Sequence, residues 1–164
     1  MTDPREFDII VYGATGFTGR LVAEYLAANY GSDDLRWAMA GRSADKLASV
    51  RDEIGASPDT PLVVADADDP DSIDAMTKRA KVIISTVGPY QLYGSELVAA
   101  CALNGTSYVD LCGEPNWMRA MIDAHEATAK ANGARIVFSC GFDSIPFDLG
   151  VWHVQRAARE RCGV

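Results

Sequence analysis

Basic residues are scarce in this sequence. Only four lysines occur among its 164 residues, and the formal net charge is −8. A protein that binds nucleic acid needs clustered lysine and arginine side chains to displace counterions from the phosphates. Here the lysines are scattered, whereas acidic residues gather in one predicted loop (residues 66–71), which we interpret as a solvent-facing segment. The composition therefore argues against nucleic acid as a partner.

Cysteine and histidine are also sparse. The four cysteines include no C-x-x-C pair, and only His125 and His153 could join them in binding a metal. Structural zinc sites and small disulfide-stabilised domains both need more regularly spaced cysteines. We therefore expect neither a metal site nor a disulfide framework.

Long apolar runs are missing as well. No segment approaches the roughly 18 apolar residues that a membrane-spanning helix needs. The first six residues are polar and lead directly into a predicted strand, not into the apolar stretch of a secretory signal. These absences predict a cytoplasmic protein, and the length fits one domain of ordinary size.

Short β-branched runs alternate with helical patterns along the whole chain. Strands are predicted at residues 7–12, 36–40, 62–65, 82–87, 107–111 and 135–139. Helices are predicted at about residues 17–30, from 44, at 71–79, 95–103 and 116–131, and as a last amphipathic helix from 146 to the C-terminus. Such alternation gives parallel strands joined by crossover helices. The predicted fold is α/β: a Rossmann-type, doubly wound, mainly parallel six-stranded sheet with helices on both faces, formed by residues 1–164 as one domain.

Some residues are predicted to define the ends and faces of these helices. Gly31 is expected to end the first helix in the left-handed conformation, and Ser43 is expected to cap the second. The buried stripe of the first helix is predicted at four positions: Leu21, Val22, Tyr25 and Leu26.

A glycine-rich segment, Gly13-Ala14-Thr15-Gly16-Phe17-Thr18-Gly19, joins the first strand to the first helix. In this context the first glycine permits a tight turn, the second lets the backbone approach a pyrophosphate, and the third lets helix and strand pack closely. The free N–H groups at the helix start then favour the anion. The spacing is G-x-x-G-x-x-G and not G-x-G-x-x-G, so a purely structural turn is the alternative. We predict that all seven residues contact a dinucleotide.

The end of the second strand distinguishes NAD from NADP. An NAD site usually has Asp or Glu at this point to bind the ribose 2′-hydroxyl. This chain instead has Arg42 and Ser43, with Lys46 one helical turn later. Arg42 can pair with a 2′-phosphate, which a carboxylate would repel. The sequence therefore predicts NADPH/NADP as the cofactor, the alternative being that Arg42 is a solvated loop residue.

Further cofactor contacts are predicted where other strands end, because ligands of open α/β sheets bind at the carboxyl ends of the strands. Asp66 and Ala67 follow the third strand and are expected near the adenine. Three residues after the fourth strand and one after the sixth complete the predicted set: Val87, Gly88, Pro89 and Gly141. The alternative is that these loop residues serve only the turns.

Familiar catalytic motifs are missing. No tyrosine has a lysine four positions later, which excludes the Tyr-x-x-x-Lys pair of short-chain dehydrogenases, and neither Gly-x-Ser-x-Gly nor His-Glu-x-x-His occurs. Since hydride transfer is the cofactor's own chemistry, the protein need supply only orientation and a proton donor. We predict Tyr90 and Asp143 as catalytic residues. Other polar residues at the same edge are Tyr93, Asp110, Glu114 and Ser144.

Asp143 and Ser144 have an alternative role. They precede Pro146 and are therefore also suited to cap the last helix.

Five stretches taken together resemble one family. They are the glycine segment with Tyr12 before it, residues 40–43, Thr86-Val87-Gly88-Pro89-Tyr90, residues 108–114 and Gly141-Phe142-Asp143-Ser144-Ile145-Pro146. This pattern is similar to that of the saccharopine dehydrogenase-like oxidoreductases, and within them to the trans-acting enoyl reductases of mycobacterial and related actinobacterial lipid synthesis.

The resemblance implies an NADPH-dependent reductase that acts on an acyl chain carried by a polyketide synthase, in the assembly of phthiocerol-type cell-envelope lipids. Sequences of that family are more than twice as long. It therefore implies that a C-terminal substrate and oligomerisation domain is absent from this chain, that the chain alone binds NADPH with little turnover, and that the full-length protein forms a homodimer. Any membrane association would come from the missing part.

Two other functions stay open. One is a non-catalytic NADP(H)-binding redox sensor, which would also lack a Tyr-x-x-x-Lys pair. The other is an amino-acid enzyme of the saccharopine dehydrogenase/reductase type, which shares the fold.

Overall fold

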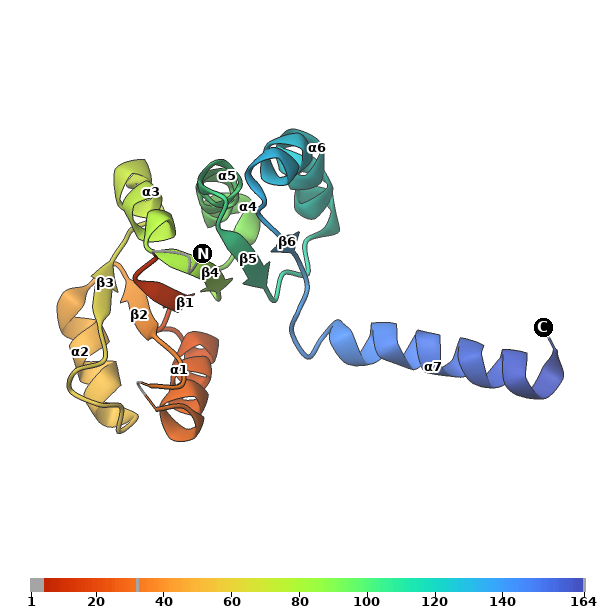
Figure 1. Cartoon of the computed structure of the whole chain (residues 1–164), viewed down its shortest axis with the longest axis horizontal. Coiled ribbons are helices and arrows are strands. Elements are labelled where there is room, and N and C mark those ends of the chain that lie inside the picture. Colours follow the sequence, from red (N-terminus) through yellow and green to blue (C-terminus); the bar gives the residue numbers. More distant parts are fainter. Residues whose placement is uncertain (1–4, 32, 164) are drawn as a thin grey trace.

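The computed structural model describes residues 5–31 and 33–163, and it contains one sheet with helices on both faces (Figure 1). Six parallel strands are arranged in the order β3-β2-β1-β4-β5-β6. The strands are β1 (Phe7–Tyr12), β2 (Trp37–Gly41), β3 (Leu62–Val64), β4 (Ala80–Ser85), β5 (Ser107–Asp110) and β6 (Ile136–Val137). This order is that of the Rossmann fold, so the predicted fold class is confirmed.

Seven helices are found in the described part of the chain. They are α1 (Phe17–Asn29), α2 (Ala44–Glu53), α3 (Pro70–Lys78), α4 (Tyr90–Tyr93), α5 (Ser95–Asn104), α6 (Pro115–Asn132) and α7 (Ile145–Cys162). The short α4 was not predicted. Strand β4 begins and ends two residues earlier than predicted, so Thr86 and Val87 already belong to the loop that follows it.

The two faces of the sheet have separate apolar cores because side chains of neighbouring strand residues point to opposite faces. Val11 and Met39 pack with Leu26 and Leu47 on the face that α1 and α2 cover. The opposite core is larger and joins the strands to α3, α5 and α6, which lie together above the sheet in Figure 1. It includes Ile10, Ile73, Leu97, Tyr108 and Trp117.

Of the three predictions about helix ends, only the cap of α2 is confirmed. Ser43 caps α2, since its hydroxyl accepts a hydrogen bond from the Lys46 backbone N–H at 3.3 Å. The Gly31 prediction is wrong: α1 ends at Asn29, Tyr30 is its extended C-cap, and Gly31 does not have a positive φ. Ser144 is the N-cap residue of α7, but neither it nor Asp143 supplies a side-chain cap.

The predicted buried stripe of α1 is only partly correct. Leu26 is buried and Val22 half-buried, whereas Leu21 and Tyr25 are exposed. Gly19 and Ala23 take their place against the sheet, because small residues allow α1 to approach β1 closely. The last helix, α7, extends away from the sheet and contains no buried residue (Figure 1).

Truncating a core side chain should show how strongly the central strand depends on packing. Ile10→Ala removes a side chain with no exposed surface from β1, and we expect the free energy of unfolding to fall by about 2–5 kcal/mol. The measurement is urea unfolding followed by circular dichroism. Leu103→Ala, at a position that is 65% exposed on α5, is the control and should change stability by no more than about 0.5 kcal/mol. Equal losses in both variants would contradict the assignment of Ile10 to the core.

Candidate functional site

A cleft of about 270 Å³ opens at the carboxyl edge of the sheet, above the ends of β1, β2, β3 and β4. Its lining comes from five different segments of the chain: Tyr12, Gly13, Thr15, Gly16, Gly41, Arg42, Asp66, Ala67, Asp68, Thr86, Val87, Gly88 and Tyr93. Eight of the predicted cofactor-binding residues are among them. The fold therefore brings together the glycine turn, the end of β2 and the loop after β3, which are far apart in the sequence.

The glycine turn brings α1 close to the sheet. Gly13 has a φ of +90°, a conformation that favours glycine, and its N–H donates to the Ala40 carbonyl at 2.9 Å. A Cβ on Gly19 would lie 2.1 Å from the Gly13 carbonyl oxygen, so no side chain fits there. Both glycines have the roles that the spacing predicted.

The first turn of α1 provides unpaired donors. Its first intrahelical hydrogen bond is donated by the N–H of Arg20 to the carbonyl of Gly16, so the N–H groups of Phe17, Thr18 and Gly19 precede the hydrogen-bond ladder. Gly16 is the N-cap and has no side chain with which to satisfy them. These N–H groups and the positive end of the helix dipole form a site suited to a pyrophosphate.

Arg42 lines the cleft directly after the end of β2. It is exposed, and within the described residues its guanidinium forms no ion pair or hydrogen bond. Ser43 and Lys46 do not line the cleft. The Ser43 hydroxyl instead caps α2 by accepting a hydrogen bond from the Lys46 N–H. The geometry thus leaves Arg42 as the one cation among the residues that line this cleft.

The floor of the cleft includes Tyr12, which the sequence reasoning did not select. Burial, followed by the nearby Asp66 carboxylate, raises the pKa of Tyr12 to about 12, while Arg42 acts in the opposite direction. Tyr12 is therefore a neutral hydroxyl beside two carboxylates, Asp66 and Asp68. Its position directly before Gly13 at the end of β1 was the available signal.

A second hollow of about 450 Å³ lies on the other side of the glycine turn. Thr18 and Val22 of α1 form one wall, the ends of β4 and β5 form the floor, and residues 140–143 close it. Thr86 lines both this hollow and the cleft. Its hydroxyl can donate to the Tyr12 carbonyl at 3.0 Å or the Gly13 carbonyl at 3.3 Å. A ligand that crosses the glycine turn would therefore occupy both spaces.

Tyr90, a predicted catalytic residue, is only 6% exposed and lines neither space. Its hydroxyl donates to the Ser85 carbonyl at 3.1 Å, and burial raises the pKa of Tyr90. Its backbone N–H and that of Gln91 donate to the Glu114 carboxylate, each at 2.8 Å. Tyr90 is thus a buried core residue next to the site, whereas Tyr93 lines the cleft.

Asp143, the other predicted catalytic residue, lines the second hollow together with Gly141. It is exposed, and its carboxylate has no hydrogen-bond partner within the described residues. The remaining predicted contacts are outside both spaces. Ala14 is fully buried, Phe17 is exposed on α1, and Pro89 is the N-cap of α4.

Asp110 organises the loops beside the second hollow. It is 3% exposed, and burial raises its pKa. The carboxylate accepts hydrogen bonds from the Tyr108 hydroxyl at 2.8 Å, the Cys112 N–H at 3.0 Å and the Ser139 N–H at 2.7 Å. These bonds connect the loop after β5 to the loop after β6, where Ser139 has a φ of +60°. Asp110 therefore holds the segment from which Gly141 and Asp143 extend.

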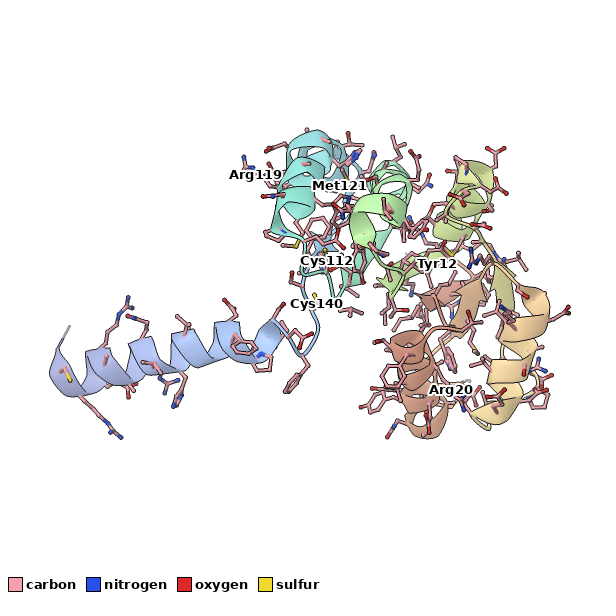
Figure 2. The ribbon with its side chains drawn as sticks, turned by 180° about the vertical axis from the view of Figure 1, so that it is seen from behind. Tyr12, Arg20, Cys112, Arg119, Met121 and Cys140 are labelled. Carbon is pink, nitrogen blue, oxygen red and sulfur yellow. The ribbon has the colours of Figure 1, made fainter. Side chains whose placement is uncertain are left out.

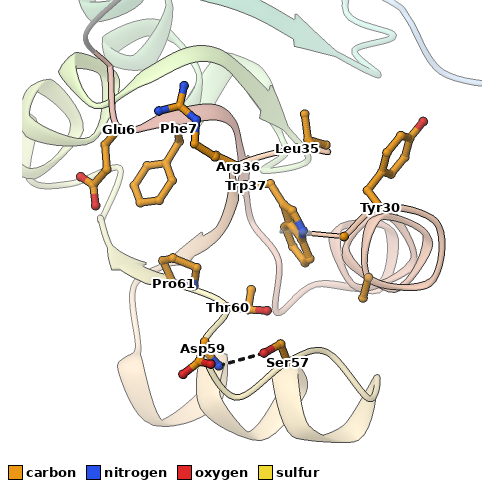
Figure 3. A pocket seen from close by; sticks show the side chains of 12 residues that line it. Glu6, Phe7, Tyr30, Leu35, Arg36, Trp37, Ser57, Asp59, Thr60 and Pro61 are labelled. Atoms are coloured by element: carbon orange, nitrogen blue, oxygen red, sulfur yellow. Dashed lines mark hydrogen bonds between the residues drawn. The ribbon is translucent and has the colours of Figure 1, made fainter. Parts of the chain in front are cut away.

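A third hollow, of about 460 Å³, lies at the opposite edge of the sheet (Figure 3). Phe7 and Trp37 mark the amino ends of β1 and β2 within it, and Tyr30 and Pro61 contribute further walls. The glycine turn follows the carboxyl end of β1, at the opposite edge of the sheet, so this hollow is not part of the nucleotide site.

The described residues contain no cluster of three or more His, Cys, Asp or Glu side chains arranged to hold a metal ion. In the same part of the chain, no helix has the length and apolarity needed to cross a membrane.

The fold and the cleft define a dinucleotide-binding Rossmann domain. Residues 9–137 match the model of the saccharopine dehydrogenase NADP-binding domain, and the chain belongs to this family. The predicted class of cofactor, NADP(H), agrees with that assignment.

Mycobacterial proteins are similar over nearly the whole chain. A protein of Mycobacterium tuberculosis, provisionally named as a trans-acting enoyl reductase, is 54% identical over 158 residues, which are 96% of this chain and 37% of the relative. The trans-acting enoyl reductase of Mycobacterium leprae is 52% identical over 159 residues, or 96% of this chain and 38% of the relative. This chain thus spans little more than a third of the length of these relatives.

A solved structure shows the same fold. Apo saccharopine dehydrogenase (L-Glu forming) from Saccharomyces cerevisiae superposes with a TM-score of 0.74 and 19% identity, over 93% of this chain and 32% of that protein.

Replacing Gly19 should damage both fold and site. Gly19→Ala would push a Cβ into the Gly13 carbonyl, and we expect a loss of about 1–3 kcal/mol in unfolding free energy together with weaker NADPH binding. Urea unfolding and fluorescence titration measure the two effects. Gly113→Ala is the matched control, since a Cβ there meets no atom within 4 Å. A Gly19→Ala variant as stable as the control would contradict the close approach of α1.

Proposed function

We propose that this chain binds NADP(H) across the glycine turn, with its adenosine half in the cleft and its nicotinamide in the second hollow. The support is the arrangement of the two spaces on either side of one helix N-terminus, with Thr86 in both. In this arrangement the N–H groups at the start of α1 hold the pyrophosphate. Asp66 and Ala67 lie beside the adenine, and Val87 and Gly88 close the cleft above the ribose.

The preference for NADPH over NADH rests on Arg42 in this proposal. A guanidinium without a partner can form two parallel hydrogen bonds with a 2′-phosphate. No carboxylate is present at the end of β2 to compete for it or to bind a 2′-hydroxyl. Lys46 and Ser43, one turn into α2 and at its cap, add positive charge and a hydroxyl near the same phosphate.

The proposed reaction of the longer protein is the reduction of an α,β-unsaturated acyl chain. NADPH supplies a hydride when bound, and the protein must orient the acyl group and supply one proton. Of the two predicted catalytic residues, Asp143 is the better placed, because its carboxylate faces the second hollow and is unpaired within the described chain. The Tyr90 hydroxyl already donates to the Ser85 carbonyl, so we propose that Tyr90 helps to hold the loop after β4 and does not donate the proton.

The wider setting is also part of the proposal. The relatives named as trans-acting enoyl reductases support an acyl substrate presented by a polyketide synthase, in the synthesis of cell-envelope lipids. We propose that residues 1–164 form an NADP-binding domain, and that the additional length of the relatives includes a substrate domain.

The cofactor preference is tested by replacing Arg42. The unchanged chain should bind NADPH at least tenfold more tightly than NADH, a difference of about 1.4 kcal/mol. In Arg42→Ala we expect the two dissociation constants to become similar, measured by fluorescence titration of the reduced nucleotide. Arg119→Ala, which removes an exposed arginine paired with Asp123 on α6 (Figure 2), should leave both constants unchanged. Equal affinities in the unchanged chain would refute the 2′-phosphate site.

The reductase activity is tested by NADPH oxidation in the presence of a 2-enoyl thioester. We expect this chain to bind NADPH with little turnover, and a protein of the relatives' length to reduce the thioester. In that longer protein, Asp143→Asn should lower kcat by about 10²–10⁴-fold with the NADPH dissociation constant unchanged. If the longer protein binds NADPH and reduces no acyl substrate, the sensor function would replace the reductase.

A further inference from the structure

The cleft contains a phenol hydroxyl that has no hydrogen-bond partner in the described chain. Tyr12 is the last residue of β1 (Figure 2) and lines the cleft, although it is only 3% exposed. Within residues 5–31 and 33–163 its hydroxyl neither donates nor accepts a hydrogen bond. Hydroxyl groups of buried residues normally have a partner. The raised pKa of Tyr12, about 12, keeps this hydroxyl protonated at neutral pH. Tyr12 therefore presents a free donor to a ligand in the cleft.

The ring of Tyr12 is held in place by the larger apolar core. The parallel register sets Tyr12 beside Ala40 on β2, and Ala40 beside Val63 on β3. All three belong to that core, together with Ala65, and neither alanine has any exposed surface. Because the ring is already packed, a ligand that accepts from the hydroxyl need not order it further.

A carboxylate acceptor lies close to this donor. Of the charged groups near Tyr12, the Asp66 carboxylate raises its pKa the most, yet it accepts no hydrogen bond from the Tyr12 hydroxyl. The Asp66 N–H donates to the Ser72 hydroxyl at 3.0 Å, and one Asp66 carboxylate oxygen accepts from the Asp68 N–H at 3.2 Å. The second carboxylate oxygen has no partner among the described residues. The cleft thus offers a donor and an acceptor that are near each other and not bonded to each other.

One edge of adenine is the complement of this pair. Along that edge the 6-amino group is a donor and the adjacent N1 is an acceptor. The edge lies opposite the nitrogen that carries the ribose, so it points away from a ribose whose 2′-phosphate is held by Arg42. Hypoxanthine and guanine have the reverse arrangement, with a carbonyl oxygen at position 6 and a hydrogen on N1. That oxygen would face the Asp66 carboxylate with no hydrogen between them, which is unfavourable.

We propose that Tyr12 is a specificity-determining residue for the base of the dinucleotide: its hydroxyl donates to N1 of adenine while the 6-amino group donates to Asp66. This inference rests on the proposed function, since it requires the adenosine half to occupy the cleft. It adds a donor that the proposed NADP(H) site did not include. Arg42 then determines the preference for the 2′-phosphate and Tyr12 with Asp66 the preference for the base, so the two preferences are separable.

Removing the Tyr12 hydroxyl tests the donor. NADPH, NADH and the hypoxanthine analogue of NADPH are titrated by the fluorescence of the reduced nicotinamide, which all three carry. The unchanged chain should bind NADPH at least about tenfold more tightly than the hypoxanthine analogue. Tyr12→Phe should weaken the binding of NADPH and of NADH by the same factor, about three- to tenfold, and should reduce the preference for adenine over hypoxanthine.

A structural role for the hydroxyl would give a different result. The hydroxyl has no partner in the described chain, so Tyr12→Phe should leave the urea unfolding midpoint without nucleotide unchanged. Tyr25→Phe is the matched control, because it removes a tyrosine hydroxyl from a residue on α1 that is 59% exposed and does not line the cleft. This control should leave all three dissociation constants unchanged.

Asp66→Asn tests the acceptor. The side-chain amide of this variant can donate to an oxygen at position 6, so the dissociation constants of NADPH and its hypoxanthine analogue should become similar. Equal binding of these two nucleotides by the unchanged chain would overturn the inference and leave the NADP(H) site unaffected. So would a Tyr12→Phe variant that keeps the full preference for adenine, or one that loses affinity for NADPH and not for NADH, which would place the hydroxyl at the 2′-phosphate. An unchanged chain that does not bind NADPH would overturn the proposed function and this inference together.

Discussion

The close approach of α1 to β1 is the constraint on which the rest of the site depends. Only a hydrogen atom fits at Gly19 against the Gly13 carbonyl, and the Thr86 hydroxyl lies within hydrogen-bonding distance of the Tyr12 and Gly13 carbonyls. Because of this approach, the N-terminus of α1 lies directly over the carboxyl edge of the sheet. The cleft and the second hollow are the spaces that remain on its two sides. The two glycines therefore shape the walls of the cleft and of the second hollow as well as the turn itself.

A second set of interactions holds the far side of the site. Asp110 accepts three hydrogen bonds, two of them from backbone N–H groups of different loops. Glu114 accepts two from the start of α4. Buried or half-buried carboxylates of this kind fix backbone segments that no helix or strand ladder would hold. The loops that follow β4, β5 and β6 thus keep a defined shape although each consists of only a few residues.

Much of this could be predicted from the sequence, because periodicity and glycine spacing act over a few residues. The succession of strands and helices along the chain, the Ser43 cap and the structural roles of Gly13 and Gly19 are of this local kind. The place of Thr86 between the two spaces and the burial of Tyr90 could not be predicted, since they depend on how distant segments meet at the sheet edge. Leu21 and Tyr25 of α1 were mispredicted as buried for the same reason: an apolar stripe shows that a helix face needs a cover, not which surface covers it.

Thr86 lines both the cleft and the second hollow, and this shared wall has a consequence for affinity. Each space alone is small and open, and would hold a fragment such as an adenosine phosphate or a nicotinamide weakly. In the proposed binding mode a short connection joins the two halves of the dinucleotide, so binding of one half raises the local concentration of the other at its own space. The domain can thus reach a useful affinity from two modest contacts. It would also release the whole ligand once either half is displaced.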